Sequence, residues 1–287
     1  MTVAARPVPP RSDEAPICVL VDYDGTISRV DIGDELLRRF VDDPAVAVKE
    51  ADYDAGRVGS RELLRWYMDI LPRDADRLRA AAGSIPQDES LPAFVRVARS
   101  CGVIVEVVSD GLGFYVASNL ARLGLGDLAV ATNENRIATG GAGMAFPYGH
   151  PRCFVCGTCK RERVRAHQAA GRAVVFVGDG MSDRFAAFHA DVVFAKGSLA
   201  GVCDREGWPY EAWDRFDELT EWLSASLEDG ALPRTAAELQ VWQGIHRPAA
   251  AWRATASGRP GFICGPEAWG PDRAVPVPSV DRSAAGP

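Results

Sequence analysis

The sequence lacks several features that would place it in common protein classes. Its 287 residues contain no apolar run near the roughly 20 residues of a membrane span, and residues 1–16 hold no apolar segment typical of a signal peptide. The seven cysteines are odd in number and unevenly spread, which does not suit a secreted disulfide framework. Positive charge is not in excess either, because 32 Lys and Arg stand against 39 Asp and Glu. We therefore expect a reduced, soluble, cytoplasmic protein that binds neither nucleic acid nor a membrane.

Short runs rich in valine and isoleucine alternate with helical stretches from residue 16 to about residue 229. These runs are 17–21, 103–108, 128–132, 173–177 and 191–195. Such alternation is typical of an α/β fold in which helices cover both faces of a doubly wound parallel sheet. The sequence therefore predicts a Rossmann-like α/β core.

The gap between the first two runs is too long for a simple crossover, so it must contain structure of its own. Leu36 and Phe40 mark one amphipathic helix in this gap, and Leu63, Tyr67 and Leu71 mark another. We therefore expect a small helical cap inserted into the core after its first strand.

The same reasoning divides the chain into regions. We expect a flexible leader at 1–15, a core domain formed by 16–29 and 89–229, and the cap at 30–88. Residues 230–287, rich in Pro, Gly and Ala with interspersed Trp, predict a partly irregular C-terminal extension. The extension is expected to cover an apolar patch or to make the contact of a homodimer.

Carboxylates follow two of the predicted strands. Asp22 and Asp24 come directly after the run 17–21, and Asp179 follows the run 173–177, with Asp183 four residues on. Since ligands bind at the carboxyl ends of strands in doubly wound sheets, we expect these side chains to meet. Three or four carboxylates without softer ligands suit a hard divalent cation, and the sequence predicts a Mg²⁺ site.

Two further positions turn this metal site into a candidate phosphate site. Ser109 ends the run 103–108, where its hydroxyl and the backbone at Asp110 and Gly111 can hold anionic oxygens of a substrate. Lys160 opens a predicted helix, where it opposes the helix dipole unless an anion is shared between them. Taken alone, Ser109 suits a helix cap and Lys160 a solvated basic face. Their order along the chain favours a joint site.

The ordered set resembles the four motifs of the haloacid dehalogenase superfamily. The matching stretches are Asp22-x-Asp24-Gly25-Thr26, Ser109, Lys160 and Gly178-Asp179-Gly180-x-Ser182-Asp183. The inserted cap resembles that of the phosphoserine-phosphatase-like subgroup. The stretches "CGTCK" and "AKGSLAGVCDREGWPYEAWDRFDEL" are similar to the methionine-salvage branch, the 2-hydroxy-3-keto-5-methylthiopentenyl-1-phosphate phosphatases. The resemblance covers roughly residues 17–228.

The resemblance implies a Mg²⁺-dependent phosphatase that works through an aspartyl phosphate. Asp22 would be the nucleophile, and Asp24 would protonate the leaving alcohol and later deprotonate water. Mg²⁺ would be held by Asp22, by the backbone carbonyl of Asp24 and by Asp179. Because expulsion of a halide needs no proton, Asp24 favours phosphoester cleavage over dehalogenation.

The remaining motif residues would act on the transferring phosphoryl group. By the same resemblance, Ser109 and Lys160 would hold its oxygens, and Asp183 would orient Lys160 or a metal-bound water. Transfer of the phosphoryl group to another alcohol stays open, because an aspartyl phosphate does not dictate its acceptor.

The cap is expected to select the substrate, a phosphorylated small molecule. In a rough alignment, the cap glutamate of phosphoserine phosphatases falls at Asp31, and their carboxylate-binding arginine falls near Tyr67. Loss of that guanidinium disfavours phosphoserine, although Arg57 or Arg65 is available to replace it. A sugar-like or keto-sugar-like phosphate held by Asp31 is favoured, with phosphoserine phosphatase and phosphotransferase as alternatives.

Four candidate zinc ligands precede the predicted phosphate lysine. His150, Cys153, Cys156 and Cys159 recur every three residues. Zinc takes four nitrogen or sulfur ligands, but so short a stretch is cramped for a structural site, so packed or loop thiols are the default interpretation. A non-catalytic, zinc-containing binding protein on the same fold is thus a second function class. Hydrolysis of p-nitrophenyl phosphate with Mg²⁺, with and without EDTA, separates the two.

Overall fold

The computed structural model describes residues 16–54, 57–138, 141–150 and 155–249 of the chain. Its main sheet has six parallel strands in the order β3-β2-β1-β6-β7-β8. The strands are β1 (Ile17–Val21), β2 (Ile104–Val108), β3 (Ala129–Ala131), β6 (Ala173–Gly178), β7 (Val192–Ala195) and β8 (Glu211–Ala212). The predicted α/β fold is confirmed. The edge strand β8 was not predicted, because two residues are too short to show a periodic pattern.

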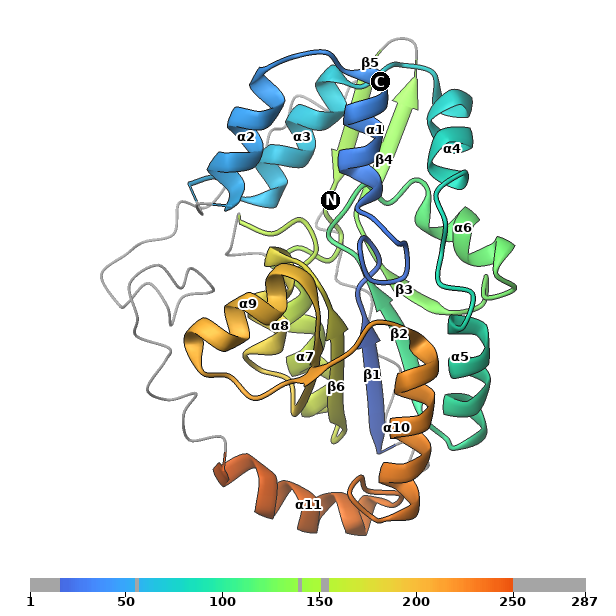
Figure 1. Ribbon diagram of the computed structural model, residues 1–287, viewed down its shortest axis with the longest axis vertical. Coiled ribbons are helices and arrows are strands. Elements are labelled where there is room, and N and C mark those ends of the chain that lie inside the picture. Colours follow the sequence, from blue (N-terminus) through green and yellow to red (C-terminus); the bar gives the residue numbers. More distant parts are fainter. Residues whose placement is uncertain (1–15, 55–56, 139–140, 151–154, 250–287) are drawn as a thin grey trace, which may run out of the picture.

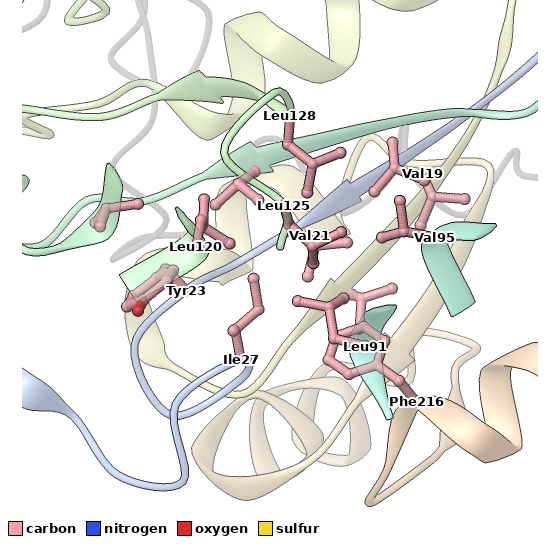
Figure 2. Close-up of a cluster of buried hydrophobic side chains, with 14 of the residues drawn as sticks. Val19, Val21, Tyr23, Ile27, Leu91, Val95, Leu120, Leu125, Leu128 and Phe216 are labelled. Atoms are coloured by element: carbon pink, nitrogen blue, oxygen red, sulfur yellow. The ribbon is translucent and has the colours of Figure 1, made fainter. Parts of the chain in front are cut away.

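β1 lies at the centre of the sheet, and every one of its side chains is buried. Val19 and Val21 point into one apolar cluster, which Figure 2 shows with Leu91, Val95 and Phe216. The alternate residues of β1 belong to a second cluster on the opposite face of the sheet. Since both faces are covered, β1 reads in the sequence as a continuous apolar run rather than as an alternation.

Helices form a layer on each face of the sheet (Figure 1). One layer contains α5 (Leu91–Ser100), α6 (Val116–Arg122) and α10 (Phe216–Glu228). The other layer contains α7 (Lys160–Ala169), α8 (Arg184–Ala187) and α9 (Gly197–Glu206), and a 3₁₀ turn at Met181–Asp183 precedes α8. A buried ion pair fixes α7 to the sheet, because Arg163 Nε donates to Glu106 Oε1 of β2 over 2.8 Å.

Four helices lie beyond the carboxyl ends of the strands, at the top of Figure 1. They are α1 (Ile32–Phe40), α2 (Ala45–Asp54), α3 (Ser60–Ile70) and α4 (Ala75–Gly83), and a hairpin of β4 (Glu134–Ala138) and β5 (Gly141–Ala145) packs against α3. The two helices predicted from Leu36 and Leu63 are α1 and α3. α2 gave no such signal because none of its residues is buried.

The segments that enter and leave this helical group run side by side. Arg29 N donates to Pro86 O over 3.0 Å, and Asp88 N donates to Ile27 O over 2.8 Å. Tyr23 adds a side-chain contact, since its hydroxyl donates to Gln87 Oε1 over 2.7 Å. The insertion therefore leaves the core and returns to it at one place, and the domain limits 30–88 stay a prediction.

The start of the C-terminal extension is helical. In α11 (Ala236–Ala249), Trp242 is buried beside Leu232 and Leu239, and its indole N–H donates to Ala231 O over 2.8 Å. This part of the extension covers an apolar patch, as expected. The leader 1–15 and residues 250–287 lie outside the described residues. Among the helices of the described ranges, none combines the length and apolarity that a bilayer crossing requires.

Candidate active site

Most of the residues predicted for the site line one pocket of about 310 Å³ at the carboxyl edge of the sheet. The core contributes Asp22, Asp24, Asp110, Gly111, Lys160 and Asp179 to its wall, and the cap contributes Asp31 and Tyr67. The pocket thus joins residues that lie far apart in sequence. Ser109 and Asp183 are fully buried behind this wall.

Lys160 is a buried bridge between two carboxylates. Its Nζ lies 2.6 Å from Asp22 Oδ1 and 2.6 Å from Asp183 Oδ1, and it donates to Ser182 Oγ over 2.9 Å. Burial alone lowers the pKa of the Lys160 ammonium, but the charges of Asp183 and Asp22 outweigh this effect and raise it. Lys160 therefore stays charged, and the solvated-face interpretation of this lysine is wrong. Its neighbours Arg161 and Arg163 are buried as well.

Three carboxylates come close enough to share one cation. Single oxygens of Asp22, Asp179 and Asp183 all lie within 4.8 Å of one another. Asp183 has other partners for both of its oxygens, because Oδ1 pairs with Lys160 and Oδ2 accepts from the backbone N–H groups of Asp179 and Gly180 over 3.0 and 2.9 Å. Asp22 and Asp179 thus remain as the carboxylates available to an ion, and Asp183 orients its neighbours.

Asp179 is held in place against the loop that follows β1. The hydroxyl of Thr26 donates to Asp179 Oδ1 over 2.6 Å. Gly25 has φ +74°, and a Cβ at this position would lie 2.1 Å from Asp179 Oδ2, so a side chain would fill the space where the carboxylate lies. Burial, followed by the negative charge of Asp183, raises the pKa of Asp179 to about 7. For Asp22 the direction is the same, and burial is again the largest cause.

Asp24 faces away from this carboxylate group. Tyr115 of the loop before α6 donates its hydroxyl to both Asp24 oxygens, over 2.8 and 2.9 Å, and Ile32 N donates to Oδ1 over 3.2 Å. Gly111 passes so close that a Cβ there would lie 2.1 Å from Asp24 Oδ2. Burial, followed by the charge of Asp31, raises the pKa of Asp24. Burial therefore favours the protonated form of this carboxyl group, while the hydrogen bonds from Tyr115 and Ile32 favour its charged form.

In the segment after β2, the side chains of Ser109 and Asp110 form hydrogen bonds with other protein groups. Ser109 Oγ accepts from Gly111 N over 3.2 Å. Asp110 Oδ2 accepts from Ser60 Oγ of α3 over 2.6 Å, and its Oδ1 accepts from Thr158 N over 2.7 Å. Asp110, predicted to contact the substrate, therefore joins the cap to the loop before α7.

The cap side of the pocket contains residues that sequence reasoning missed. Asp34 of α1 and Glu50, Tyr53 and Asp54 of α2 line the pocket beside the predicted residues Asp31 and Tyr67. Asp31 also caps α1, since its Oδ1 accepts from Asp34 N over 3.0 Å. The acidic spacing along α1 and α2 was visible in the sequence, but no pattern indicated which helix faces turn toward the core.

The candidate zinc ligands are only partly described. Cys153 lies outside the described residues, while Cys156 is half-buried and Cys159 is buried at the start of α7. Within the described ranges, the group of Asp22, Asp179 and Asp183 is the one cluster of metal-ligating side chains that could hold an ion. The interpretation of this stretch as packed or loop thiols, with zinc binding as the alternative, stays a prediction.

The chain matches a known protein family and two named bacterial relatives. The family model described as haloacid dehalogenase-like hydrolase matches residues 19–187. A protein of Exiguobacterium sp. strain AT1b, named 2-hydroxy-3-keto-5-methylthiopentenyl-1-phosphate phosphatase, is 27% identical over 215 residues, which cover 71% of this chain and 96% of that protein. A protein of the same name from Exiguobacterium sibiricum is 27% identical over 221 residues, covering 73% and 97%.

Solved structures show the same fold. A phospho-aspartyl intermediate analogue of phosphoserine phosphatase aligns with a TM-score of 0.56 at 18% identity and covers 72% of this chain and 99% of that one. A substrate-bound phosphoserine phosphatase complex aligns with a TM-score of 0.55 at 19% identity, covering 71% and 97%. At this level of identity the similarity concerns the fold alone.

Proposed function

Since the chain belongs to the haloacid dehalogenase-like hydrolase family and is one of its phosphatases, we propose that it hydrolyses a small-molecule phosphomonoester through an aspartyl phosphate on Asp22. One observation carries this proposal. The carboxylate of Asp22 is held by buried Lys160 over 2.6 Å, and the separately anchored carboxyl of Asp24 lines the same pocket. A nucleophile and an acid that face one cavity are the parts that phosphoester cleavage requires.

The residues present fit Mg²⁺. The carboxylates of Asp22 and Asp179 approach each other in a buried place where their pKa values are raised, and hard oxygen ligands of this kind suit Mg²⁺. We propose that these two carboxylates and the backbone carbonyl of Asp24 hold the ion. When bound, Mg²⁺ supplies positive charge that offsets the repulsion between the nucleophile and the phosphate.

The chain's own residues would perform the reaction in two steps. In the first, Asp22 forms a bond to phosphorus while the bond to the alcohol oxygen breaks, and Asp24 gives that oxygen its proton. In the second, Asp24 takes a proton from water as the water oxygen bonds to phosphorus and Asp22 is released. Lys160 stays charged throughout and stabilises the phosphoryl oxygens, and Asp183 holds Lys160 in place. The role of Ser109 on the same oxygens stays a prediction.

The leaving group is proposed to be sugar-like or keto-sugar-like, with hydroxyls that Asp31 accepts from. The names of the two Exiguobacterium relatives support this class. Phosphoserine is disfavoured because Lys160 is the one cationic side chain among the described residues that line the pocket. The two candidate replacements lie elsewhere, since Arg57 pairs with Asp52 and the Arg65 guanidinium lies over the Phe146 ring.

The insertion at 30–88 is proposed to act as a cap that closes on the substrate, and its neighbouring entry and exit segments provide a hinge.

The homodimer stays a prediction, which a measurement of the mass of the protein in solution by light scattering would check.

Hydrolysis of p-nitrophenyl phosphate by the full chain tests the proposed function. We expect turnover with Mg²⁺, loss of turnover with EDTA, and recovery when Mg²⁺ is restored. Borohydride reduction during turnover, followed by peptide mass spectrometry, should convert residue 22 alone to homoserine, because borohydride reduces an acyl phosphate. Asp22→Asn should abolish both signals, whereas Glu62→Gln, a neutralisation on the exposed face of α3, should keep them. Turnover by Asp22→Asn at a rate close to wild type would remove Asp22 as the nucleophile.

A further inference from the structure

The start of the cap helix α3 rests on a loop of the core, residues 155–158. Gly59, which precedes α3, has no side chain that could cap the helix. The backbone N–H of Arg61 donates instead to Val155 O over 3.1 Å, and Arg61 Nε donates to Cys156 O over 2.6 Å. Since the first N–H groups of a helix have no partner within it, the core loop supplies a partner that α3 itself lacks.

A set of buried hydrogen bonds fixes this contact beside the pocket. Ser60 Oγ donates to Asp110 Oδ2 over 2.6 Å and accepts from Gly157 N over 3.1 Å. Asp110 Oδ1 accepts from Thr158 N over 2.7 Å. Because Ser60 and Asp110 are both buried, these bonds are shielded from water. One serine and one carboxylate thereby join the cap to two consecutive N–H groups of the loop.

The backbones of the cap and the core approach each other closely here. A Cβ at Gly59 would lie 2.5 Å from Val155 O. A Cβ at Gly157 would lie 2.6 Å from Asn133 Oδ1 and 2.7 Å from Asp110 Oδ1. Only glycine fits at either position without a shift of its neighbours, so the sequence permits α3 to dock on the loop in this arrangement.

The loop that α3 contacts leads directly to Lys160. Thr158 lies two residues before Lys160, the first residue of α7, and Lys160 N donates to Thr158 O over 3.1 Å. The Nζ of the same lysine lies 2.6 Å from Asp22 and 2.6 Å from Asp183. A shift of the loop would therefore move the backbone from which the Lys160 side chain extends into the site.

We propose that Ser60 and Asp110 are positioning residues, which transmit the docking of α3 to Lys160 through the loop 155–158. This inference rests on the proposed function, in which Lys160 stabilises the phosphoryl oxygens. Each oxygen of Asp110 already accepts a hydrogen bond from the protein, and this favours positioning over direct contact with the substrate. The docked cap thus holds the phosphate-binding lysine where the reaction requires it, in addition to covering the pocket.

Aromatic contacts hold the same cap helix at its next turn. The guanidinium groups of Arg61 and Arg65 lie over the ring of Phe146, which follows β5, at 5.5 and 5.0 Å from its centroid. Such cation–aromatic contacts are attractive. α3 therefore meets segments outside the cap at two successive turns, and its docked position is well defined without a bound ligand.

α7 has a second anchor, which limits how far a disturbance of the loop can spread. Arg163 Nε donates to Glu106 Oε1 over 2.8 Å, and His167 Nε2 lies 2.8 Å from Glu106 Oε2. These contacts are made about one and two turns after Lys160. Removal of the bonds to Asp110 should therefore displace the loop and the first turn of α7 while the rest of the helix stays on the sheet.

Substitutions at the two positions test the inference in the full chain with Mg²⁺. Asp110→Ala removes both acceptors and should lower kcat/KM about 10- to 100-fold, because misplacement of a catalytic group by about 1 Å can cost this much. Ser60→Ala removes the link to the cap alone and should lower it about 5- to 30-fold. Asp110→Asn keeps an oxygen for Thr158 N and offers an N–H to Ser60 Oγ, so its kcat/KM should stay within about fivefold of wild type.

The dependence on the leaving group distinguishes positioning from substrate contact. Because Lys160 acts on the phosphoryl oxygens, the ratio of kcat/KM between p-nitrophenyl phosphate and phenyl phosphate should change less than about twofold in every variant. Ser84→Ala is the matched control, since it removes a cap hydroxyl that donates within the cap, to Ala81 O over 2.7 Å, and it should keep the wild-type rates. A changed ratio in Asp110→Ala, or a loss in Asp110→Asn equal to that in Asp110→Ala, overturns the positioning role.

Amide hydrogen exchange provides a readout that does not depend on turnover. In Asp110→Ala and in Ser60→Ala, the amides of Gly157 and Thr158 should exchange about tenfold faster or more, because their acceptors are removed or released. The amides around His167, in the part of α7 that the second anchor holds, should keep their wild-type rates. Unchanged exchange in the loop, or an equal increase along the whole of α7, overturns the inference.

The outcomes separate this inference from the proposed function. Wild-type turnover that persists undiminished in Asp110→Ala and Ser60→Ala leaves the proposed function standing and refutes the positioning role. Absence of Mg²⁺-dependent turnover by the wild type on both esters refutes the proposed function, and the positioning role in that reaction is refuted with it. If Asp110→Ala fails to fold, Ser60→Ala and its exchange pattern decide the question alone.

Discussion

Tyr115 holds the proposed acid of the reaction, and its hydroxyl can be removed without disturbing the packing of its ring. The side chain is buried, with its ring centroid 5.9 Å from that of Tyr23 and 5.1 Å from that of Phe114. The hydroxyl donates to both oxygens of Asp24. Tyr115→Phe therefore keeps the ring and, within the described residues, leaves the backbone N–H of Ile32 as the hydrogen-bond donor to Asp24.

The size of the effect follows from how the charge on Asp24 changes. In the proposed first step, Asp24 begins as a neutral acid and becomes a carboxylate as its proton moves to the alcohol oxygen. A hydrogen bond to a neutral group contributes about 0.5–1.5 kcal/mol and one to a charged group about 1.5–3 kcal/mol. The bond from Tyr115 thus strengthens by about 1–2 kcal/mol on the way to the transition state, so its loss should lower kcat/KM about 5- to 30-fold.

The dependence on the leaving group identifies the cause. An alkyl phosphate needs the proton of Asp24, whereas p-nitrophenolate leaves without one. With kcat/KM as the readout, which reports the first step, Tyr115→Phe should lower turnover of the best alkyl phosphate by the full amount. On p-nitrophenyl phosphate the loss should stay below about threefold.

A neighbouring tyrosine provides the control. Tyr23 is buried beside Tyr115, but its hydroxyl donates to Gln87 over 2.7 Å and does not contact Asp24. Tyr23→Phe should change the ratio between the two substrates less than about twofold. Equal losses on both substrates in Tyr115→Phe, or an unchanged rate on the alkyl phosphate, would refute the reasoning about Asp24.

Three further predictions concern the metal and the cap. Asp179→Ala should raise the Mg²⁺ concentration needed for half-maximal activity about tenfold or more, and excess Mg²⁺ should partly restore the rate; an unchanged Mg²⁺ requirement would place the metal elsewhere. Because burial and Asp183 raise the pKa of Asp179 to about 7, Mg²⁺ must displace a proton below that pH. Apparent Mg²⁺ affinity should therefore rise with pH up to about 7 and then level off, and a titration series flat across this range would contradict the shift. Asp31→Ala should lower kcat/KM on the preferred substrate about 10- to 100-fold and change p-nitrophenyl phosphate far less, whereas equal losses would mean that Asp31 serves the fold.

The core of the site could be predicted because its signals are local. Asp22 and Asp24 directly follow an apolar run that only a buried strand explains, and Asp179 follows another such run. In a parallel sheet all carboxyl ends lie at one edge, so the sequence places these side chains at the same edge, and the pairing of β1 with β6 brings them together. The helix that begins at Lys160 could also be predicted from a local signal, because the lysine motif lies at the first residue of a helical stretch.

The rest of the site depends on packing between distant segments. Tyr115 reaches Asp24 across 91 positions of sequence, and no periodic pattern indicates that its hydroxyl turns toward the site. The contact of Asp110 could not be predicted either, because its partner Ser60 belongs to the cap and lies 50 positions away in the sequence. The acids of α2 were missed because that helix buries none of its residues and so gives no amphipathic signal of which face turns inward.

The core half and the cap half of the pocket differ in how their charges are balanced. In the core half, Lys160 neutralises Asp22 and Asp183, so these buried charges have partners before a substrate arrives. In the cap half, Asp34 and Glu50 have no Lys or Arg partner within the described chain. Removing one member of a balanced buried pair leaves a charge without compensation and destabilises the fold, whereas Asp34 is exposed and Glu50 half-buried, so neutralising either one leaves no buried charge behind. We therefore expect substitutions in the cap to change which phosphomonoester is accepted without altering the reaction proposed for the core.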